Sequence, residues 1–167
     1  MRVTLNYSEM ILAGQIGVCR QAANVAKGLK HRYGARDEDG WALHINGALG
    51  EIAVAKAYNL FWHGTLGQYG ATDVGNLVEV RACTKPSHSL ILHPDDADER
   101  PFALVHVAAP VCTILGWTLG KRGKDQRFWR DPGTGRPAFF VPRDALFQPE
   151  SLKALIKVRL IDEEVAA

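Results

Sequence analysis

The sequence has few of the features that mark exported proteins, membrane proteins or proteins stabilised by a structural metal ion. It contains three cysteines, Cys19, Cys83 and Cys112, and no two of them have the C-x-x-C spacing of a structural zinc site. No apolar run approaches the ~20 residues of a membrane-spanning helix, so we expect no membrane association. The opening segment MRVTLNYSEM lacks the charged and then apolar pattern of a signal peptide. These absences predict a reduced, cytoplasmic chain with buried thiols.

An excess of charge of one sign is also lacking. Lys and Arg number 20 against 18 Asp and Glu, a formal net charge of +2, and this balance neither favours nor excludes nucleic acid as a partner. There is no internal repeat and no low-complexity tract. The 167 residues, 47% hydrophobic and 23% charged, suit one folded domain with a substantial core.

The pattern of apolar residues divides this single domain into three parts. They are a helical N-terminal part (1–58), a strand-rich core (72–141) and a C-terminal helix with its tail (142–167). Ser8 is expected to cap a first helix that runs to Leu29 or Tyr33. A second helix is predicted from Trp41 to Tyr58, because Ile45, Leu49, Ile52 and Ala53 recur at helical spacing. Strands are predicted over 77–83, 90–92, 102–107, 111–119 and 139–141, short helices near 142–144 and over 150–156, and a frayed tail beyond Asp162.

The first helix and the segment after it carry a run of charges of one sign. From Met10 to Arg36 the basic residues are Arg20, Lys27, Lys30, Arg32 and Arg36, and no acidic residue lies among them. Two interpretations stay open: a solvated helix face, and a face that contacts phosphates.

Three acidic residues and one arginine form the pattern that points to chemistry. Glu79 and Arg81 lie two apart on a predicted strand, so both side chains point to one face of the sheet. Asp73 lies in a glycine-flanked loop just before that strand. Glu51 follows Gly50 in the second helix, where glycine costs up to ~1 kcal/mol and indicates close approach of a backbone or ligand. Converging carboxylates are the oxygen ligands that Mg²⁺ or Mn²⁺ prefers.

The order Gly50-Glu51, Asp73 and Glu79-Val80-Arg81 resembles the PD-(D/E)XK nuclease superfamily, which has the restriction-endonuclease-like fold. More narrowly, it resembles small nuclease-like proteins of bacteriophages in which EVR replaces E-x-K. The resemblance covers about residues 41–120. It implies an α/β fold with a mixed four- to five-stranded sheet flanked by helices. It also implies a Mg²⁺-dependent (or Mn²⁺-dependent) nuclease of the bacterial cell or phage-infected host, with Asp73, Glu79 and Glu51 as metal ligands.

The departure from that family is Arg81, where the family has lysine. Arginine does not lose its proton in a protein, so Arg81 cannot act as a base, although it can hold a phosphate electrostatically. Lys85, four residues on, is a candidate source of the missing ammonium group. The catalytic residues we predict are therefore Glu51, Asp73, Glu79 and Arg81.

A basic segment with aromatic residues follows the fourth predicted strand. We predict that residues 120–137 form a surface loop that binds nucleic acid. The predicted nucleic-acid-binding residues are Lys121, Arg122, Lys124 and Arg127 in this loop, together with Lys85 and His88 near the predicted active strand.

Several alternatives remain open from the sequence. Asp73 could be a turn residue that caps its own backbone, and Glu79 and Arg81 could form an exposed pair on an edge strand. DNA is the expected substrate, with RNA not excluded, and a homodimer is left open. The second functional class is a catalytically impaired nucleic-acid-binding protein on the same fold. The third is a structural or host-interaction protein with no nucleic-acid role.

Overall fold

The structure is a computed structural model that describes residues 1–29, 39–66, 72–133 and 135–166, with side chains as far as Ile161. Two short 3₁₀ turns, Gln126–Phe128 and Arg143–Ala145, accompany the main elements. In chain order these are β1 (Arg2–Thr4), α1 (Tyr7–Ala26), α2 (Gly40–Tyr58), β2 (Glu79–Cys83), β3 (Leu90–Leu92), β4 (Pro101–Ala108), β5 (Val111–Leu119), α3 (Gly120–Gly123), β6 (Trp129–Arg130), β7 (Ala138–Val141) and α4 (Pro149–Ala166).

The fold is α/β and contains two sheets. The larger sheet has four strands in the order β1-β5-β4-β2, and it is mixed because β2 pairs with β4 in parallel while the other pairs are antiparallel. The smaller sheet has three antiparallel strands in the order β3-β7-β6. The predicted α/β class with a mixed sheet flanked by helices is thus confirmed. Strand β2, which carries Glu79 and Arg81, lies at an edge of the larger sheet.

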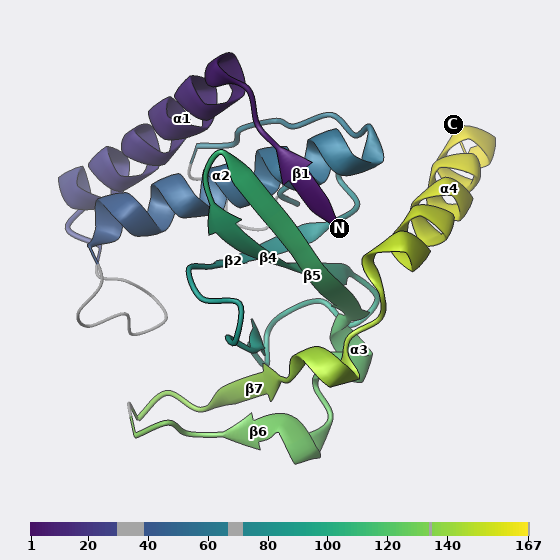
Figure 1. Ribbon diagram of the computed structural model, residues 1–167. Coiled ribbons are helices and arrows are strands. Elements are labelled where there is room, and N and C mark those ends of the chain that lie inside the picture. The colour runs from purple at the N-terminus through teal and green to yellow at the C-terminus, as the bar shows by residue number, and fades with distance from the viewer. Residues whose placement is uncertain (30–38, 67–71, 134, 167) are drawn as a thin grey trace.

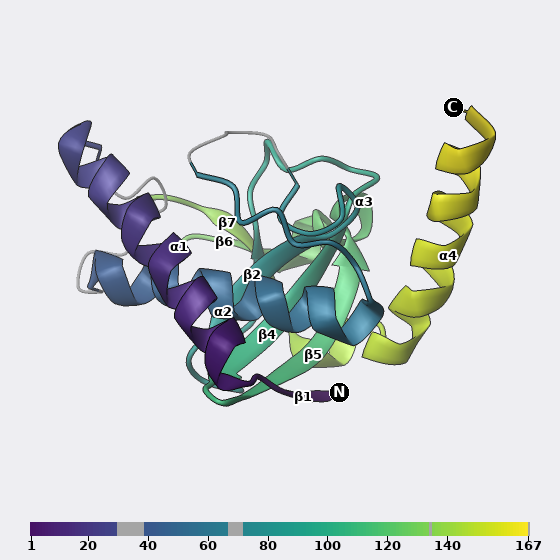
Figure 2. The same cartoon turned by 90° about the horizontal axis from the view of Figure 1, so that it is seen from above.

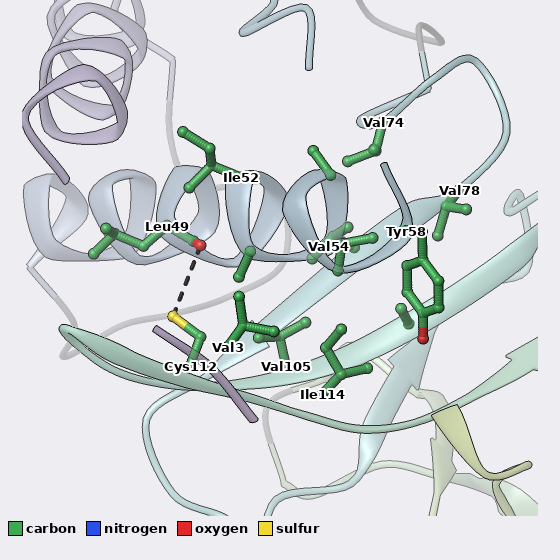
Figure 3. Close-up of a cluster of buried hydrophobic side chains, with 14 of the residues drawn as sticks. Val3, Leu49, Ile52, Val54, Tyr58, Val74, Val78, Val105, Cys112 and Ile114 are labelled. Atoms are coloured by element: carbon green, nitrogen blue, oxygen red, sulfur yellow. Dashed lines mark hydrogen bonds between the residues drawn. The ribbon is translucent and has the colours of Figure 1, made fainter. Parts of the chain in front are cut away.

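Helix α2 and the small sheet lie on opposite faces of the larger sheet. In Figures 1 and 2, α2 lies on one face of that sheet and α1 lies over α2, so the two helices and the sheet form three tiers. The larger buried cluster fills the space between α2 and the sheet, with Leu49, Val54, Val105 and Ile114 among its members (Figure 3). The second cluster lies on the other face and joins Phe102 and Leu104 to strands β3 and β7.

Helix α2 is placed on the sheet by its small residues. A Cβ on Gly50 would lie 3.3 Å from the Cβ of Ala82 and 3.4 Å from Cγ1 of Val80, so the helix backbone runs close to β2. On the side of the sheet near β1, the Cys112 thiol lies 3.9 Å from the backbone oxygen of Leu49 (Figure 3). The predicted helix over 41–58 is confirmed, with Asp39 as the residue that caps its first turn.

Several predicted boundaries are wrong for local reasons. Helix α1 begins at Tyr7, because Asn6, rather than Ser8, caps it in a reciprocal pair with Glu9. It ends at Ala26, short of Leu29; the part of the prediction that extends to Tyr33 lies outside the described residues.

The strand predicted from Leu77 begins instead at Glu79. The preceding Gly75 and Asn76 are left-handed, with φ of 57° and 56°, and form a tight turn.

The ends of the chain also differ from the prediction. The sequence analysis missed β1, whose backbone pairs with β5 and so extends the sheet. The predicted basic loop over 120–137 contains α3 and β6. The helix predicted over 150–156 continues as α4 to Ala166, so the backbone is helical beyond Asp162 where a frayed tail was expected.

Candidate functional site

Strand β2 presents Glu79 and Arg81 on the face of the sheet that lies opposite α2. Their register partners on β4 are Phe102 and Leu104, which belong to the second core cluster, whereas Val80 faces Gly50 of α2. The guanidinium of Arg81 lies 5.0 Å from the centroid of the Phe102 ring. The expectation that Glu79 and Arg81 share one face is confirmed, because strand periodicity alone decides it.

Asp73 reaches the same strand from the loop before it. Its Oδ2 accepts a hydrogen bond of 2.8 Å from the backbone N–H of Val80. Because β2 is an edge strand, this N–H has no partner strand, and the carboxylate satisfies it. The sequence left open that Asp73 is a turn residue that caps its own backbone. Asp73 does accept from a backbone N–H, but this N–H belongs to Val80 of β2.

Burial and the neighbouring Glu79 carboxyl raise the pKa of Asp73 to about 7, against the opposing effects of the Val80 N–H and the Arg81 charge. Within the described chain Asp73 forms no ion pair of its own. The neighbouring Glu79 carboxylate thus disfavours the ionisation of Asp73 at the edge of β2.

Glu51 lies on α2 and is close enough to Asp73 for the two charges to interact. Its Oε1 lies 2.6 Å from Arg20 Nη1, and its Oε2 accepts from Arg20 Nη2 at 2.9 Å and from the Trp62 indole N–H at 2.8 Å. Burial raises the pKa of Glu51, and the Asp73 charge adds to this, while Arg20 and Trp62 act in the opposite direction. Asp73 therefore interacts electrostatically with Glu51 as well as with Glu79.

Helix α2 leaves open space one turn before Glu51. A Cβ on Gly47 would meet no atom within 4 Å. Gly47 is four residues before Glu51 and so lies on the same side of the helix. A ligand near Glu51 would meet no side chain at this position.

Three arginines neutralise most of the acidic charge. Arg20 pairs with Glu51, Arg100 lies 2.9 Å from Glu79 Oε1, and Arg81 lies 2.9 Å from Asp96 Oδ1 and 3.7 Å from Glu79 Oε2. Among the described residues the cluster thus contains four carboxyl groups and three guanidinium groups, and the unmatched carboxyl group is that of Asp73.

The loop between β3 and β4 contacts Arg81 through Asp96. Asp96 caps this loop by accepting from the backbone N–H of His93 at 2.8 Å while it holds Arg81. Lys124 secures the same loop through the backbone oxygens of Pro94 and Asp96 at 3.3 and 2.7 Å, and through an ion pair with Asp98. Arg81 is therefore positioned by Asp96, and Asp96 is positioned by the contacts of its loop with Lys124.

The structure brings the four predicted catalytic residues together and adds four residues that the sequence analysis missed, namely Arg20, Trp62, Asp96 and Arg100. Among the described residues, however, no group of three or more His, Cys, Asp or Glu side chains is arranged to hold a metal ion. The three-carboxylate ligand set therefore stays a prediction. Both oxygens of Glu51 accept from protein donors, whereas Glu79 Oε1 accepts from Arg100 and Asp73 Oδ2 accepts from the Val80 N–H.

The predicted nucleic-acid-binding residues fall into two groups. Lys85 and His88 are exposed in the turn after β2, and Lys121, Arg122 and Arg127 are exposed near α3 and the turn after it. Arg122 stacks on Phe147 at 4.3 Å and Arg127 on Phe128 at 4.6 Å. Lys124 differs from these residues, because its side chain is only 17% exposed and is bonded to the β3–β4 loop.

Of the five basic residues between Met10 and Arg36, the structure describes Arg20 and Lys27. Arg20 points inward to Glu51, and Lys27 lies just past the end of α1. Lys30, Arg32 and Arg36 lie outside the described residues. Arg20 is thus not part of a solvated face, and for the rest of the run the two interpretations stay predictions.

Comparison with known proteins adds little to this description. No protein-family model matches the chain, and no solved structure matches it. Over 86 residues the chain is 31% identical to corytuberine synthase from Coptis japonica, a match that covers 46% of this chain and 16% of that protein. The match spans about a sixth of the relative, so it shows no shared family. No helix among the described residues is long and apolar enough to cross a membrane.

Proposed function

We propose that this chain is a metal-dependent nuclease that hydrolyses phosphodiester bonds, with DNA as its expected substrate. The observation that carries the proposal is the Asp73–Glu79 pair, two adjacent carboxyl groups at the edge of β2 whose proximity and burial raise the pKa of Asp73 to about 7. A cation near Asp73 would relieve this repulsion. Mg²⁺ is commonly held by one or two carboxylates together with water and substrate phosphates, and the pair fits that requirement.

Asp73 and Glu79 are the residues that would hold Mg²⁺ or Mn²⁺. A bound divalent ion supplies an acidified water and stabilises charge on the reacting phosphate. Glu51 takes a different part in the proposal from the one expected, since Arg20 and Trp62 occupy both of its oxygens. Paired with Arg20, it borders the cation site without direct ligation.

Arg81 acts as a fixed positive charge in this proposal. Asp96 and the Phe102 ring hold its guanidinium on the same face as Glu79. An arginine in this position can donate to the oxygens of a phosphate and stabilise their developing charge. It cannot take a proton from water, so another group must act as the base.

The exposed basic residues near the site extend the proposal to the nucleic-acid backbone. Lys85 and His88 follow the strand that carries Glu79 and Arg81, and Lys121, Arg122 and Arg127 lie on the segment after β5. These side chains would bind phosphates without reading bases.

A non-catalytic nucleic-acid-binding protein is the second candidate, and one observation favours it. The position where the resembled family has lysine holds Arg81, and Arg81 is already paired with Asp96. A chain that has lost its catalytic lysine and neutralised its acidic residues could still bind phosphates through its surface cations.

A cleavage assay tests the proposal. The purified chain is incubated with single-stranded DNA, double-stranded DNA and RNA in Mg²⁺, in Mn²⁺ and in EDTA. We expect cleavage of at least one substrate with either metal ion and none in EDTA. Asp73→Asn and Glu79→Gln should abolish cleavage, because each removes ligand charge with little change of volume. Glu99→Gln, an exposed carboxylate outside the cluster, is the matched control and should cleave normally.

The other outcomes separate the alternatives. Retention of nucleic acid at low salt without cleavage would favour the binding protein. If the wild-type chain neither cleaves nor binds any substrate, the carboxylates and arginines are a structural network and the nuclease proposal is wrong.

A further inference from the structure

The exposed side of α1 is apolar, whereas the exposed side of a surface helix is usually polar or charged. Its two charged residues, Glu9 and Arg20, are used within the molecule: Glu9 pairs with Lys56 at 2.8 Å, and Arg20 pairs with Glu51. The side of α1 that faces away from the molecule has no charge and carries large exposed apolar side chains. These are Ile11 (46% exposed), Leu12 (47%), Val18 (43%) and Val25 (60%).

The exposed apolar residues form a regular stripe. Ile11, Val18 and Val25 are spaced seven residues apart, which is two helical turns, so they lie on one line along the helix. Gln15 and Ala22, which fall between them at four-residue steps, are exposed and uncharged. Figures 1 and 2 show α1 on the outside of α2, away from the sheet. We call this stripe the outer face of α1.

Two glycines of α1 face different surroundings, and the difference is informative. A Cβ on Gly17 would lie 2.5 Å from Cα of Ile45, so Gly17 is needed for the contact between α1 and α2. A Cβ on Gly14 would meet nothing within 4 Å. Glycine inside a helix costs ~1 kcal/mol relative to alanine, and nothing within the described chain accounts for that cost at Gly14. Gly14 lies between Ile11 and Val18, where it would allow a second backbone to approach closely.

We propose that the outer face of α1 is the contact surface of a homodimer in which two copies of α1 pack antiparallel about a two-fold axis at Val18. The stripe is self-complementary in this arrangement. Val18 meets Val18 of the partner subunit, and Ile11 meets Val25 of the partner subunit, because both lie seven residues from the axis. An isologous contact requires such a match of a surface with itself.

The chemistry of the face favours a second copy over other partners. Two identical charged faces would repel each other, whereas this one has no charge to oppose its own copy. A helix that lies on a membrane surface is typically rich in Lys and Arg on its polar face, and α1 contains one Arg, which is buried on Glu51. An acidic or basic protein partner would likewise find no complementary charge on the stripe.

The area available sets the expected strength of the dimer. A helix of 20 residues is about 30 Å long and about 10 Å wide, so the helix pair alone covers roughly 300 Å² per copy. Specific interfaces typically bury about 800 Å² per partner. We therefore expect a modest dimer whose population depends on protein concentration.

Sedimentation equilibrium with charged variants tests both the contact and its geometry. The wild-type chain should show a concentration-dependent monomer–dimer equilibrium. Val18→Asp and Val18→Arg should each raise the dissociation constant by about 30-fold, the loss typical of a residue at the centre of an interface. An equimolar mixture of the two variants should restore the dimer, because Asp and Arg would face each other at the axis.

The control is Val158→Asp on α4, a valine that is also exposed (56%) and lies on another surface. It should leave the equilibrium unchanged, and circular dichroism should show all variants folded. A wild-type chain that stays monomeric at every concentration, or that binds phosphatidylcholine–phosphatidylserine vesicles through α1, would overturn the proposal. So would a dimer that Val18→Asp does not weaken, or a mixture that fails to re-form it.

Discussion

Arg20 of α1 and Glu51 of α2 form a bidentate ion pair, with nitrogen–oxygen distances of 2.6 and 2.9 Å. The pair is shielded, with 14% of the Arg20 side chain and 7% of the Glu51 side chain exposed. It joins the outer helix to the helix that packs on the sheet, and it lies next to Asp73. The same contact therefore bears on the packing of α1 and on the charge of the candidate site.

Removal of Arg20 should destabilise the fold strongly. Arg20→Ala leaves the buried Glu51 carboxylate without its cation, and the free energy of unfolding should fall by about 3–5 kcal/mol. The Glu9–Lys56 pair also joins α1 to α2, but its Lys56 side chain is 40% exposed. Lys56→Ala should therefore cost about 1 kcal/mol or less. Urea denaturation of the two variants measures both changes, and equal losses would contradict this account of the buried pair.

Stability should depend on pH through Asp73. Its pKa in the folded chain is about 7, above the ordinary 3.8, so between these values the folded state binds more protons than the unfolded state. The free energy of unfolding should therefore decrease as the pH rises from about 4 to about 7, by an amount on the order of a few kcal/mol. Asp73→Asn removes the group and should flatten the dependence.

The comparison between wild type and Asp73→Asn isolates this effect, because the two chains differ only in this carboxyl group. Urea denaturation in EDTA at about pH 5 and about pH 8 supplies the four free energies. If Asp73→Asn loses as much stability between the two pH values as the wild type, the titrating group is another one.

The sequence predicted the parts of the fold and site that depend on local pattern. The strands over 90–92 and 111–119 have the bounds expected of them, because apolar segments bounded by turn residues mark strand ends. The common face of Glu79 and Arg81 follows from the two-residue period of a strand. The strand β1 was missed, since three residues give no periodic signal and are held by pairing with a distant segment.

The charge partners of the site could not be predicted for a related reason. Arg20 is 31 residues from Glu51, and Asp96 is 15 residues from Arg81. Nothing in the local sequence distinguishes these residues from solvated ones, and the basic run after Met10 suggested the opposite orientation for Arg20. The contact between Asp96 and Arg81 depends on how β3 and β4 are arranged in space.

The two glycines of α1 provide a matched test of the helix contact. Gly17→Ala would place a methyl group 2.5 Å from the Ile45 backbone, so α1 and α2 must separate. We expect the free energy of unfolding to fall by about 1–3 kcal/mol, the usual cost of overpacking. Gly14→Ala meets no atom and should instead add up to about 1 kcal/mol through helix propensity. Thermal or urea unfolding of dilute protein measures both, and a destabilised Gly14→Ala would mean that this position is not open.

The basic segment after β5 should separate into phosphate-binding and structural residues. Lys121 is exposed, and Arg127 has 62% of its side chain exposed despite its 3.3 Å pair with Asp125. If both contact phosphates, replacing the two by alanine should flatten the plot of log affinity against log salt concentration by about 1.4–1.8, or ~0.7–0.9 per contact. Lys124→Ala should leave that slope unchanged and lower stability by about 1–3 kcal/mol, since Lys124 holds the loop that contains Asp96. Fluorescence anisotropy with a labelled oligonucleotide, over a series of salt concentrations, measures the slopes. An unchanged slope in the double variant would mean that these charges do not bind nucleic acid.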